Sequence, residues 1–144
     1  MSIPEHSRAH WMGALARAKP ARLAALMPDL PDYSVIRAPE IGTVMVQGRM
    51  GGTGAPFNLG EITVTRCVVA LTRGATGHAH VQGRDKGHAL RAAVADALMQ
   101  AGDAGAAAII ETLTREEKAA SQTQADRAAA TRVEFFTMTR GEDA

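Results

Sequence analysis

The sequence has 144 residues, of which 46% are hydrophobic and 22% charged, and its length predicts a single domain over residues 1–144. A net charge of +1 and only five aromatic residues (one Trp, one Tyr and three Phe) argue against a nucleic-acid-binding protein. One cysteine excludes an intrachain disulfide, and the lack of a long apolar run or a signal-like N-terminus predicts a cytoplasmic protein without membrane contact.

Two short helices are predicted at the start of the chain. Ser7 is a suitable N-cap for a helix over residues 8–18, which carries an apolar stripe at helical spacing. Pro20 can open a second helix, because its missing N–H would have no partner in the first turn. Pro28 ends that helix.

Period-two alternation then predicts antiparallel strands. The candidates in this part of the chain are Tyr33–Arg37, Thr43–Met50, Glu61–Arg73 and His78–Gln82. The first lies between prolines and is therefore expected at a sheet edge. The third changes phase, which indicates a bulge near Arg66 or burial of both faces. Gly74–Gly77 reads as a hairpin loop.

The rest of the chain is predicted to be mainly helical. Asp85 can cap a helix over residues 86–101, which residues 102–105 interrupt. Thr114 and Glu117 form a capping box for an alanine-rich helix to about residue 131. That helix lacks large apolar side chains, so we expect residues 112–132 to form an arm that contacts a partner subunit. Residues 133–140 read as a last strand.

These elements predict the α+β class, with an antiparallel sheet of about four or five strands and helices at both ends of the chain. The most suggestive segment for chemistry is glycine-rich. Its backbone N–H groups and guanidinium could bind a phosphate, although a tight turn would need the same glycines. The candidate residues are Arg49, Gly51, Gly52 and Gly54.

A second candidate phosphate site is the junction before the helix over residues 86–101. Helix N-termini bind anions, and Arg84, Lys86 and His88 lie there. The alternative is that Asp85 simply caps the helix while both basic side chains are solvated. A strand that is apolar on both faces needs a neighbour packed against each face. The candidate partner contacts are therefore Phe135, Phe136, Met138 and Arg140.

The remaining reactive residues give weak signals. His78 and His80 share one face of a strand and could bind metal with His88, but no carboxylate or cysteine has the spacing to complete a site, so no metal is expected. Cys67 reads as a small core residue. We find neither paired carboxylates nor a Ser-His-Asp arrangement, so no catalytic residue is assigned.

Four segments in order, together covering nearly the whole chain, carry a family resemblance. They are His10-Trp11-Met12, residues 49–54, Gly83-Arg84-Asp85-Lys86 with His88-Ala89, and residues 135–138 with Arg140-Gly141. Together they resemble the PhnG family, the G subunit of the carbon–phosphorus lyase system of phosphonate degradation.

The resemblance implies an accessory role in a complex with the H, I and J subunits and the L protein. The implied reaction transfers methylphosphonate to the ribose C1′ of ATP with release of adenine. ATP would be a substrate of the complex, and no cofactor is expected on this chain. The later radical step belongs to the J subunit and its iron–sulfur cluster, which agrees with the single Cys67 here.

Two other functions stay open from the residues alone. A stand-alone nucleotide- or phosphate-binding regulatory module would use the two segments rich in glycine and arginine. A small metalloenzyme would use His78, His80 and His88.

Overall fold

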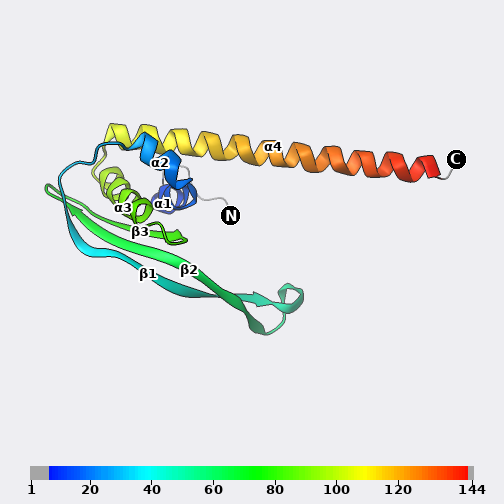
Figure 1. Ribbon diagram of the computed structural model, residues 1–144, viewed down its shortest axis with the longest axis horizontal. Helices are drawn as coiled ribbons and strands as arrows, with labels where there is room; N and C mark the ends of the chain where they lie inside the picture. The colour runs from blue at the N-terminus through cyan, green and yellow to red at the C-terminus, as the bar shows by residue number, and fades with distance from the viewer. Residues whose placement is uncertain (1–6, 143–144) are drawn as a thin grey trace. The chain divides into compact units, whose positions relative to one another are not determined.

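The structure, a computed structural model, describes residues 7–142, with side chains described for residues 7–49 and 51–132. The chain divides into two compact units, Met1–Ile110 and Glu111–Ala144. Unit 1 contains an antiparallel sheet with helices packed on one of its faces (Figure 1). Unit 2 is the continuation of the last helix. The described residues are therefore of the expected α+β class.

The two N-terminal helices form where capping residues predict them. Helix α1 (Arg8–Arg17) begins after Ser7, whose side chain accepts a hydrogen bond from the His10 N–H at 3.1 Å. Helix α2 (Pro20–Leu26) has proline in its first turn. Leu15 and Leu23 are completely or almost completely buried, so these helices contribute to the core of unit 1.

The sheet has three strands in the described part of the chain, in the order β1 (Tyr33–Arg49), β2 (Pro56–Leu71) and β3 (Thr76–Gln82). The expected number of four or five is not reached for two reasons. The strands predicted over residues 33–37 and 43–50 fall in one continuous strand, β1, which ends at Arg49 and tolerates Pro39 because it lies at the sheet edge. Residues 133–140, the other predicted strand, are helical.

The irregular pairing lies mainly on β1. Register shifts fall between Val35 and Arg37 and between Arg37 and Glu40, where β1 has one residue more than β2. The second shift is opposite Arg66, so the predicted bulge belongs to the neighbouring strand. On β2, Thr65, Cys67 and Val69 are buried in plain alternation. The phase change arises because Ile62 and Val64 lie on the opposite face of β2, away from the helices.

The central helix α3 (Lys86–Gln100) covers that face of the sheet. Asp85 caps it as predicted, accepting from the His88 N–H at 2.9 Å. The core beneath α3 is built from small residues, with Ala93 and Val94 completely buried. Close approach is needed at Gly77 of β3, where an added Cβ would lie 1.8 Å from the carbonyl oxygen of Ala93. Helix and strand therefore touch through their backbones there.

The last helix differs most from the prediction. Helix α4 runs over Ala104–Glu142, begins ten residues before the predicted capping box and continues through the predicted strand. Asp103 supplies its N-cap interaction, accepting from the Ala106 N–H at 2.8 Å. Between Gly105 and Gly141 there is neither glycine nor proline, so nothing in the sequence stops the helix. All side chains at residues 115–132 are exposed.

Candidate functional site

The glycine-rich segment forms the turn between β1 and β2. A short 3₁₀ turn (η1, Met50–Gly52) follows β1, and Gly51 and Gly52 have φ values of 61° and 81°. The Arg49 guanidinium donates to the carbonyl oxygen of Gly54 at 3.2 Å and so bridges the two sides of the turn. Two left-handed glycines are what a tight hairpin turn needs, and such a turn can also present backbone N–H groups to an anion.

We call residues 49–54 the tip loop. Arg49, Gly51 and Gly52 are exposed, and Gly54 is half-buried. No acidic residue lies within the tip loop, so its charge is that of Arg49 alone. The loop is therefore accessible and chemically suited to a phosphate or phosphonate group.

The second candidate segment, at the N-terminus of α3, is occupied by its own cap. Arg84 and Lys86 are exposed, but the Asp85 carboxylate already accepts the His88 N–H. A phosphate placed there would meet that carboxylate at close range, which opposes binding. The alternative interpretation, a capped helix with solvated basic side chains, thus agrees with the local hydrogen bonding.

The two segments do not form one site. Phe57, at the tip, lies seven residue steps along β2 from Val64, which pairs with Gln82 at the end of β3. At about 3.3 Å per residue, this separates the tip loop from the start of α3 by roughly 20 Å or more. A single phosphate group cannot contact both.

The three histidines do not form a common site, because His88 is buried on α3 and the other two lie on β3. The His88 side chain is buried, and its Nε2–H donates to the carbonyl oxygen of Leu15 at 2.8 Å, which ties α3 to α1. His78 and His80 are exposed on β3. No cluster of three or more His, Cys, Asp or Glu suited to a metal occurs among the residues that the structure describes.

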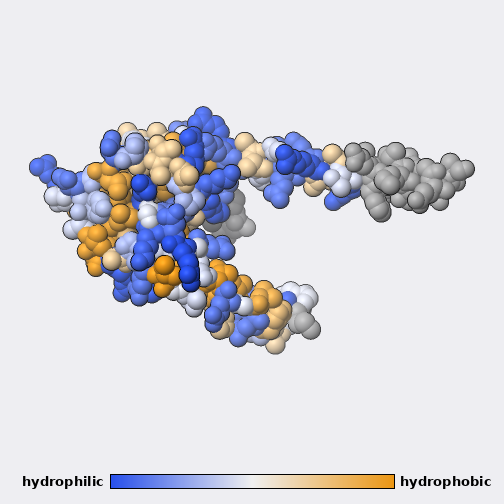
Figure 2. All heavy atoms as spheres, in the orientation of Figure 1, coloured by the Kyte–Doolittle hydropathy of each residue, from blue (hydrophilic) through white to orange (hydrophobic). Residues whose placement is uncertain are grey.

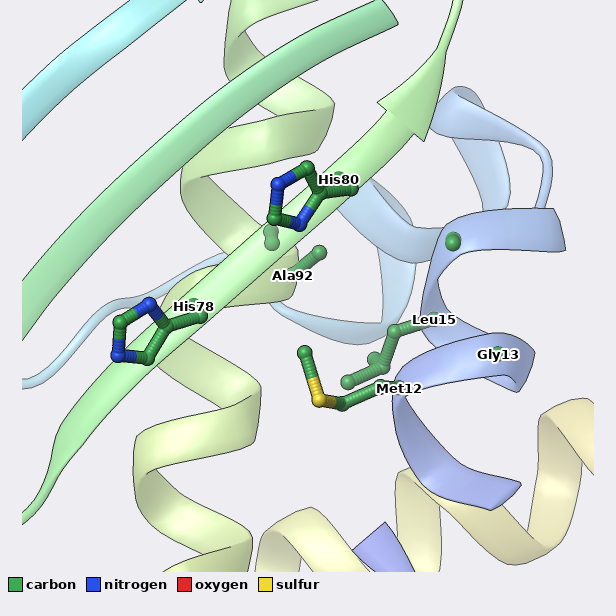
Figure 3. A pocket seen from close by; sticks show the side chains of 8 residues that line it. Met12, Gly13, Leu15, His78, His80 and Ala92 are labelled. Atoms are coloured by element: carbon green, nitrogen blue, oxygen red, sulfur yellow. The ribbon is translucent and has the colours of Figure 1, made fainter. Parts of the chain in front are cut away.

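A pocket of about 230 Å³ lies between α1 and the free edge of β3 (Figure 3). In Figure 3 the side chains of Met12 and Leu15 extend from α1 toward the strand that carries His78 and His80. The remaining lining residues are Gly13, Ala16, Ala79 and Ala92. The pocket walls are mostly apolar, so it offers little to a phosphate.

Sequence reasoning missed Asp96 on α3, a polar residue whose carboxylate accepts five hydrogen bonds. Its carboxylate is fully buried and pairs with the Arg8 guanidinium, with Nη2 at 2.8 Å from Oδ2 and Nε at 3.2 Å from Oδ1. It also accepts from Trp11 Nε1 at 2.8 Å, the His78 N–H at 2.9 Å and Gln100 Nε2 at 3.2 Å. Asp96 thus joins α1, β3 and α3.

The hydrogen bonds to Asp96 control its ionisation. Burial alone would raise the pKa of this carboxyl group, but the donors Arg8, the His78 N–H and Trp11 outweigh it and hold the pKa below its ordinary value. The pKa of Arg8 is raised in turn by its hydrogen bond to Asp96. Both groups are therefore charged at neutral pH, and their role is to hold the fold together.

Cys67 is buried, and burial raises the pKa of its thiol. It is therefore protonated and inert at neutral pH, as expected for a core residue.

The predicted partner contacts Phe135, Phe136, Met138 and Arg140 lie on α4, and their side chains are outside the described part of the structure. No single helix among the described residues is both long and apolar enough to cross a membrane, although α3 and α4 taken as one bent pair meet that length and composition test.

Comparison with known proteins gives two consistent matches. The family model of the phosphonate metabolism protein PhnG matches residues 6–141. A curated relative from Rhizobium meliloti (strain 1021) is 45% identical over 141 residues, which cover 94% of this chain and 90% of the relative. That relative is the alpha-D-ribose 1-methylphosphonate 5-triphosphate synthase subunit PhnG.

Proposed function

The chain belongs to the PhnG family of phosphonate metabolism proteins, and from this premise we propose that it is an accessory subunit of a synthase in the carbon–phosphorus lyase system. In the proposed reaction, an oxygen of methylphosphonate forms a bond to the ribose C1′ of ATP. The bond from C1′ to adenine breaks, and adenine leaves with the bonding electrons. The product is the ribose 1-methylphosphonate 5-triphosphate of the relative's name.

The observation that carries this proposal is the extent of the match. The relative, itself a synthase subunit, is 45% identical over nearly the full length of both chains. The likeness therefore includes the sheet, the capped helix α3 and α4, and is not confined to one motif. We infer that this chain acts as a subunit in the same way, with the H, I and J subunits and the L protein as its partners.

An accessory role agrees with the side chains that the structure describes. The Cys67 thiol is buried and protonated, and the Asp96 carboxylate has all its hydrogen bonds within the fold. Displacement at C1′ needs a positioned phosphonate and a stabilised leaving group rather than a nucleophile from this chain. The chain would therefore position substrate or shape the site, while another subunit supplies acid–base chemistry.

We further propose that the tip loop contacts the anionic substrates. Both ATP and methylphosphonate carry phosphorus oxygens that accept hydrogen bonds from guanidinium and backbone N–H groups. Arg49 is exposed beside Gly51 and Gly52, whose left-handed conformation fits an anion-binding turn. Gly54 completes the loop by accepting from Arg49. Arg84, Lys86 and His88 remain weaker candidates, because Asp85 lies among them and His88 is buried.

The test is adenine release from ATP and methylphosphonate by the synthase assembled with and without this chain. We expect no activity from the chain alone and a large loss when it is omitted. Activity of the isolated chain, or full activity of the complex without it, would contradict the accessory role. Tight ATP binding by the isolated chain, without any effect on the synthase, would favour the stand-alone regulatory module.

The role of the tip loop is tested by Arg49→Ala in the assembled synthase. Loss of one charge-assisted hydrogen bond, about 1.5–3 kcal/mol, predicts a roughly 10- to 100-fold fall in kcat/KM. Arg49→Lys should recover part of it by keeping the charge. Arg73→Ala is the matched control, because Arg73 is an exposed arginine in the turn at the other end of β2. Equal kcat/KM values for Arg49→Ala and Arg73→Ala would contradict a contact between Arg49 and the substrates.

A further inference from the structure

The β1–β2 hairpin continues well beyond the rest of the sheet (Figure 1). Strand β3 pairs with β2 only from Val64 to Ala70, so residues 43–49 and 56–63 have strand partners only in each other. We call this two-stranded part the ribbon. An isolated two-stranded hairpin is marginally stable in water, because it has no layer against which to bury a face. A ribbon of this length therefore suggests that something else covers it.

The two faces of the ribbon differ in composition. Residues directly opposite in an antiparallel pair share a face, so Val44 lies with Ile62, and Gly42 with Val64. These positions alternate with Thr65, which is buried under the helices, and they therefore face away from α3. The face toward the helix layer carries Thr43, Met45, Glu61 and Thr63 and is mixed in polarity.

A register shift adds two large side chains to the outer face. Between Val46 and Gln47, β2 has one residue more than β1, and beyond this point Phe57 pairs with Gly48. Phe57 and Leu59 lie against Gly48, where an added Cβ would be 3.0 Å from Leu59 Cδ1 and 3.4 Å from Phe57 Cζ. The outer face thus becomes a continuous apolar strip, formed by Val44, Val46, Phe57, Leu59, Ile62 and Val64.

Three of the six side chains of this strip are exposed, and the other three, Val46, Ile62 and Val64, are half-buried. Leu59 is 62% exposed, Val44 47% and Phe57 41%, and the other exposed large hydrophobic side chains among the described residues also lie on β1 or β2. In Figure 2 apolar side chains lie along the ribbon, interspersed with polar ones. Contiguous exposed apolar surface of this kind marks a protein interface in a soluble protein.

We propose that the outer apolar strip docks another subunit of the synthase, one that presents an apolar and uncharged surface. This inference rests on the proposed function, because it takes its partner from the same complex. The strip leads directly to the tip loop, so a subunit packed along it would meet Arg49 where we place the substrate phosphates. Docking would thereby bring the tip loop into a site shared between two chains.

The sequence of the ribbon also decides how the partner is held. Arg49 and Glu61 are its only charged residues, and neither lies in the strip, so electrostatic attraction contributes little. Within the ribbon a bulge interrupts the β2 edge near Leu59, and the exposed apolar side chains project from the outer face of the ribbon, not along its edges. The partner therefore packs against the face of the ribbon, and its binding should change less than threefold between 0.1 and 1 M NaCl.

The experiment compares two neighbouring residues on opposite faces. The tagged full chain is co-expressed with the other synthase subunits as wild type, Val44→Asp, Leu59→Asp or Met45→Asp. Val44 and Met45 are similarly exposed (47% and 52%), so the two substitutions place the same charge with similar cost to the free chain. Val44→Asp and Leu59→Asp should weaken association at least tenfold, while Met45→Asp changes it less than threefold.

The outcomes separate the possible occupants. Retention of all subunits by both outer-face variants, with unchanged affinity, would overturn the proposal. So would loss of self-association in those variants with the subunits still bound, because a second copy would then cover the strip. Circular dichroism and the thermal midpoint of each free variant establish that it folds. Failure of the wild-type chain to bind any synthase subunit would instead contradict the proposed function.

Discussion

The carboxylate of Asp96 is buried in the core of unit 1, yet it is ionised. Its cost of desolvation is offset because five hydrogen bonds reach it from α1, β3 and α3. Arg8 and Trp11 reach it from α1, the His78 N–H from β3 and Gln100 from α3 itself. Loss of the charge would therefore weaken the contacts among all three elements.

Asp96→Asn should destabilise unit 1 by about 3 kcal/mol at pH 7, because the amide NH₂ would face groups that are themselves donors. Urea unfolding followed by circular dichroism measures the change. Asp103→Asn is the control, since Asp103 is an exposed cap and asparagine caps equally well. Equal losses for the two variants would show that the hydrogen bonds to Asp96 contribute no more than an ordinary helix cap.

The same carboxylate predicts a pH dependence. Its pKa is lower in the folded than in the unfolded chain, so its stabilising effect is complete above the unfolded value of about 3.9. The effect is lost as the pH falls through the lower, folded value. The stability difference between wild type and Asp96→Asn should therefore be constant from pH 7 to pH 5 and shrink toward pH 2. A difference that does not change with pH would contradict this account.

Sequence reasoning identified residues of unit 1 whose hydrogen-bond partners lie nearby in the chain, but it missed residues whose partners lie far away in the chain. Ser7 and Asp85 were predicted as caps because each bonds a backbone N–H three residues away. Asp96 and Arg8 are 88 residues apart, and no local pattern links them. One signal was present: Asp96 is a lone charge within an apolar run of α3, which is costly unless a partner is buried with it.

At the level of elements, the contact between β3 and α3 depends on Gly77. A Cβ there would lie 1.8 Å from the carbonyl oxygen of Ala93 and 2.8 Å from the backbone nitrogen of Ala97. Backbone atoms cannot move aside as a flexible side chain can. The strand can approach the helix this closely only because the residue has no side chain.

Gly77→Ala should cost about 3 kcal/mol or more, because helix and strand must separate to admit one methyl group. Gly42→Ala is the matched control on β1, where an added Cβ meets nothing within 4 Å, and it should change stability by less than about 0.5 kcal/mol. Thermal and urea unfolding of both variants provides the measurement. A tolerated Gly77→Ala would mean that β3 and α3 are not in contact through their backbones.

Helix α4 shows why one prediction about an element was wrong. Residues 133–140 have apolar side chains at neighbouring positions, which fits a strand covered on both faces as well as a helix. Periodicity over eight residues cannot decide between the two. An uninterrupted alanine-rich helix precedes these residues. Extending a helix that has already formed requires no new nucleation, so residues 133–140 continue it.

At the level of the whole molecule, the two units should differ in local stability. The amides of α3 lie in a buried core, whereas residues 115–132 of α4 have exposed side chains. Hydrogen exchange of the free chain should be slow in α3, near the global unfolding limit, and at least 100-fold faster over residues 115–132. Equal protection of both helices would contradict two separate units.

The same measurement in the assembled synthase tests the predicted arm. If residues 112–132 contact a partner subunit, as we propose, their exchange should slow on assembly. The turn at residues 72–75 is an internal reference, because it lies at the end of the sheet remote from the tip loop. Unchanged exchange in α4 would contradict a partner contact by residues 112–132. The ribbon would then remain as the proposed docking surface.

The order in which the chain is made gives the contacts of Asp96 a consequence for biosynthesis. Arg8 and Trp11 leave the ribosome early and cannot complete their hydrogen bonds until Asp96 has been added. The 39 residues of α4 follow, and at about 5–20 residues per second they take roughly 2–8 s to translate. The core also takes Ala106 and Ile110 from the start of α4, so it can close only after the first turns of α4 have been made.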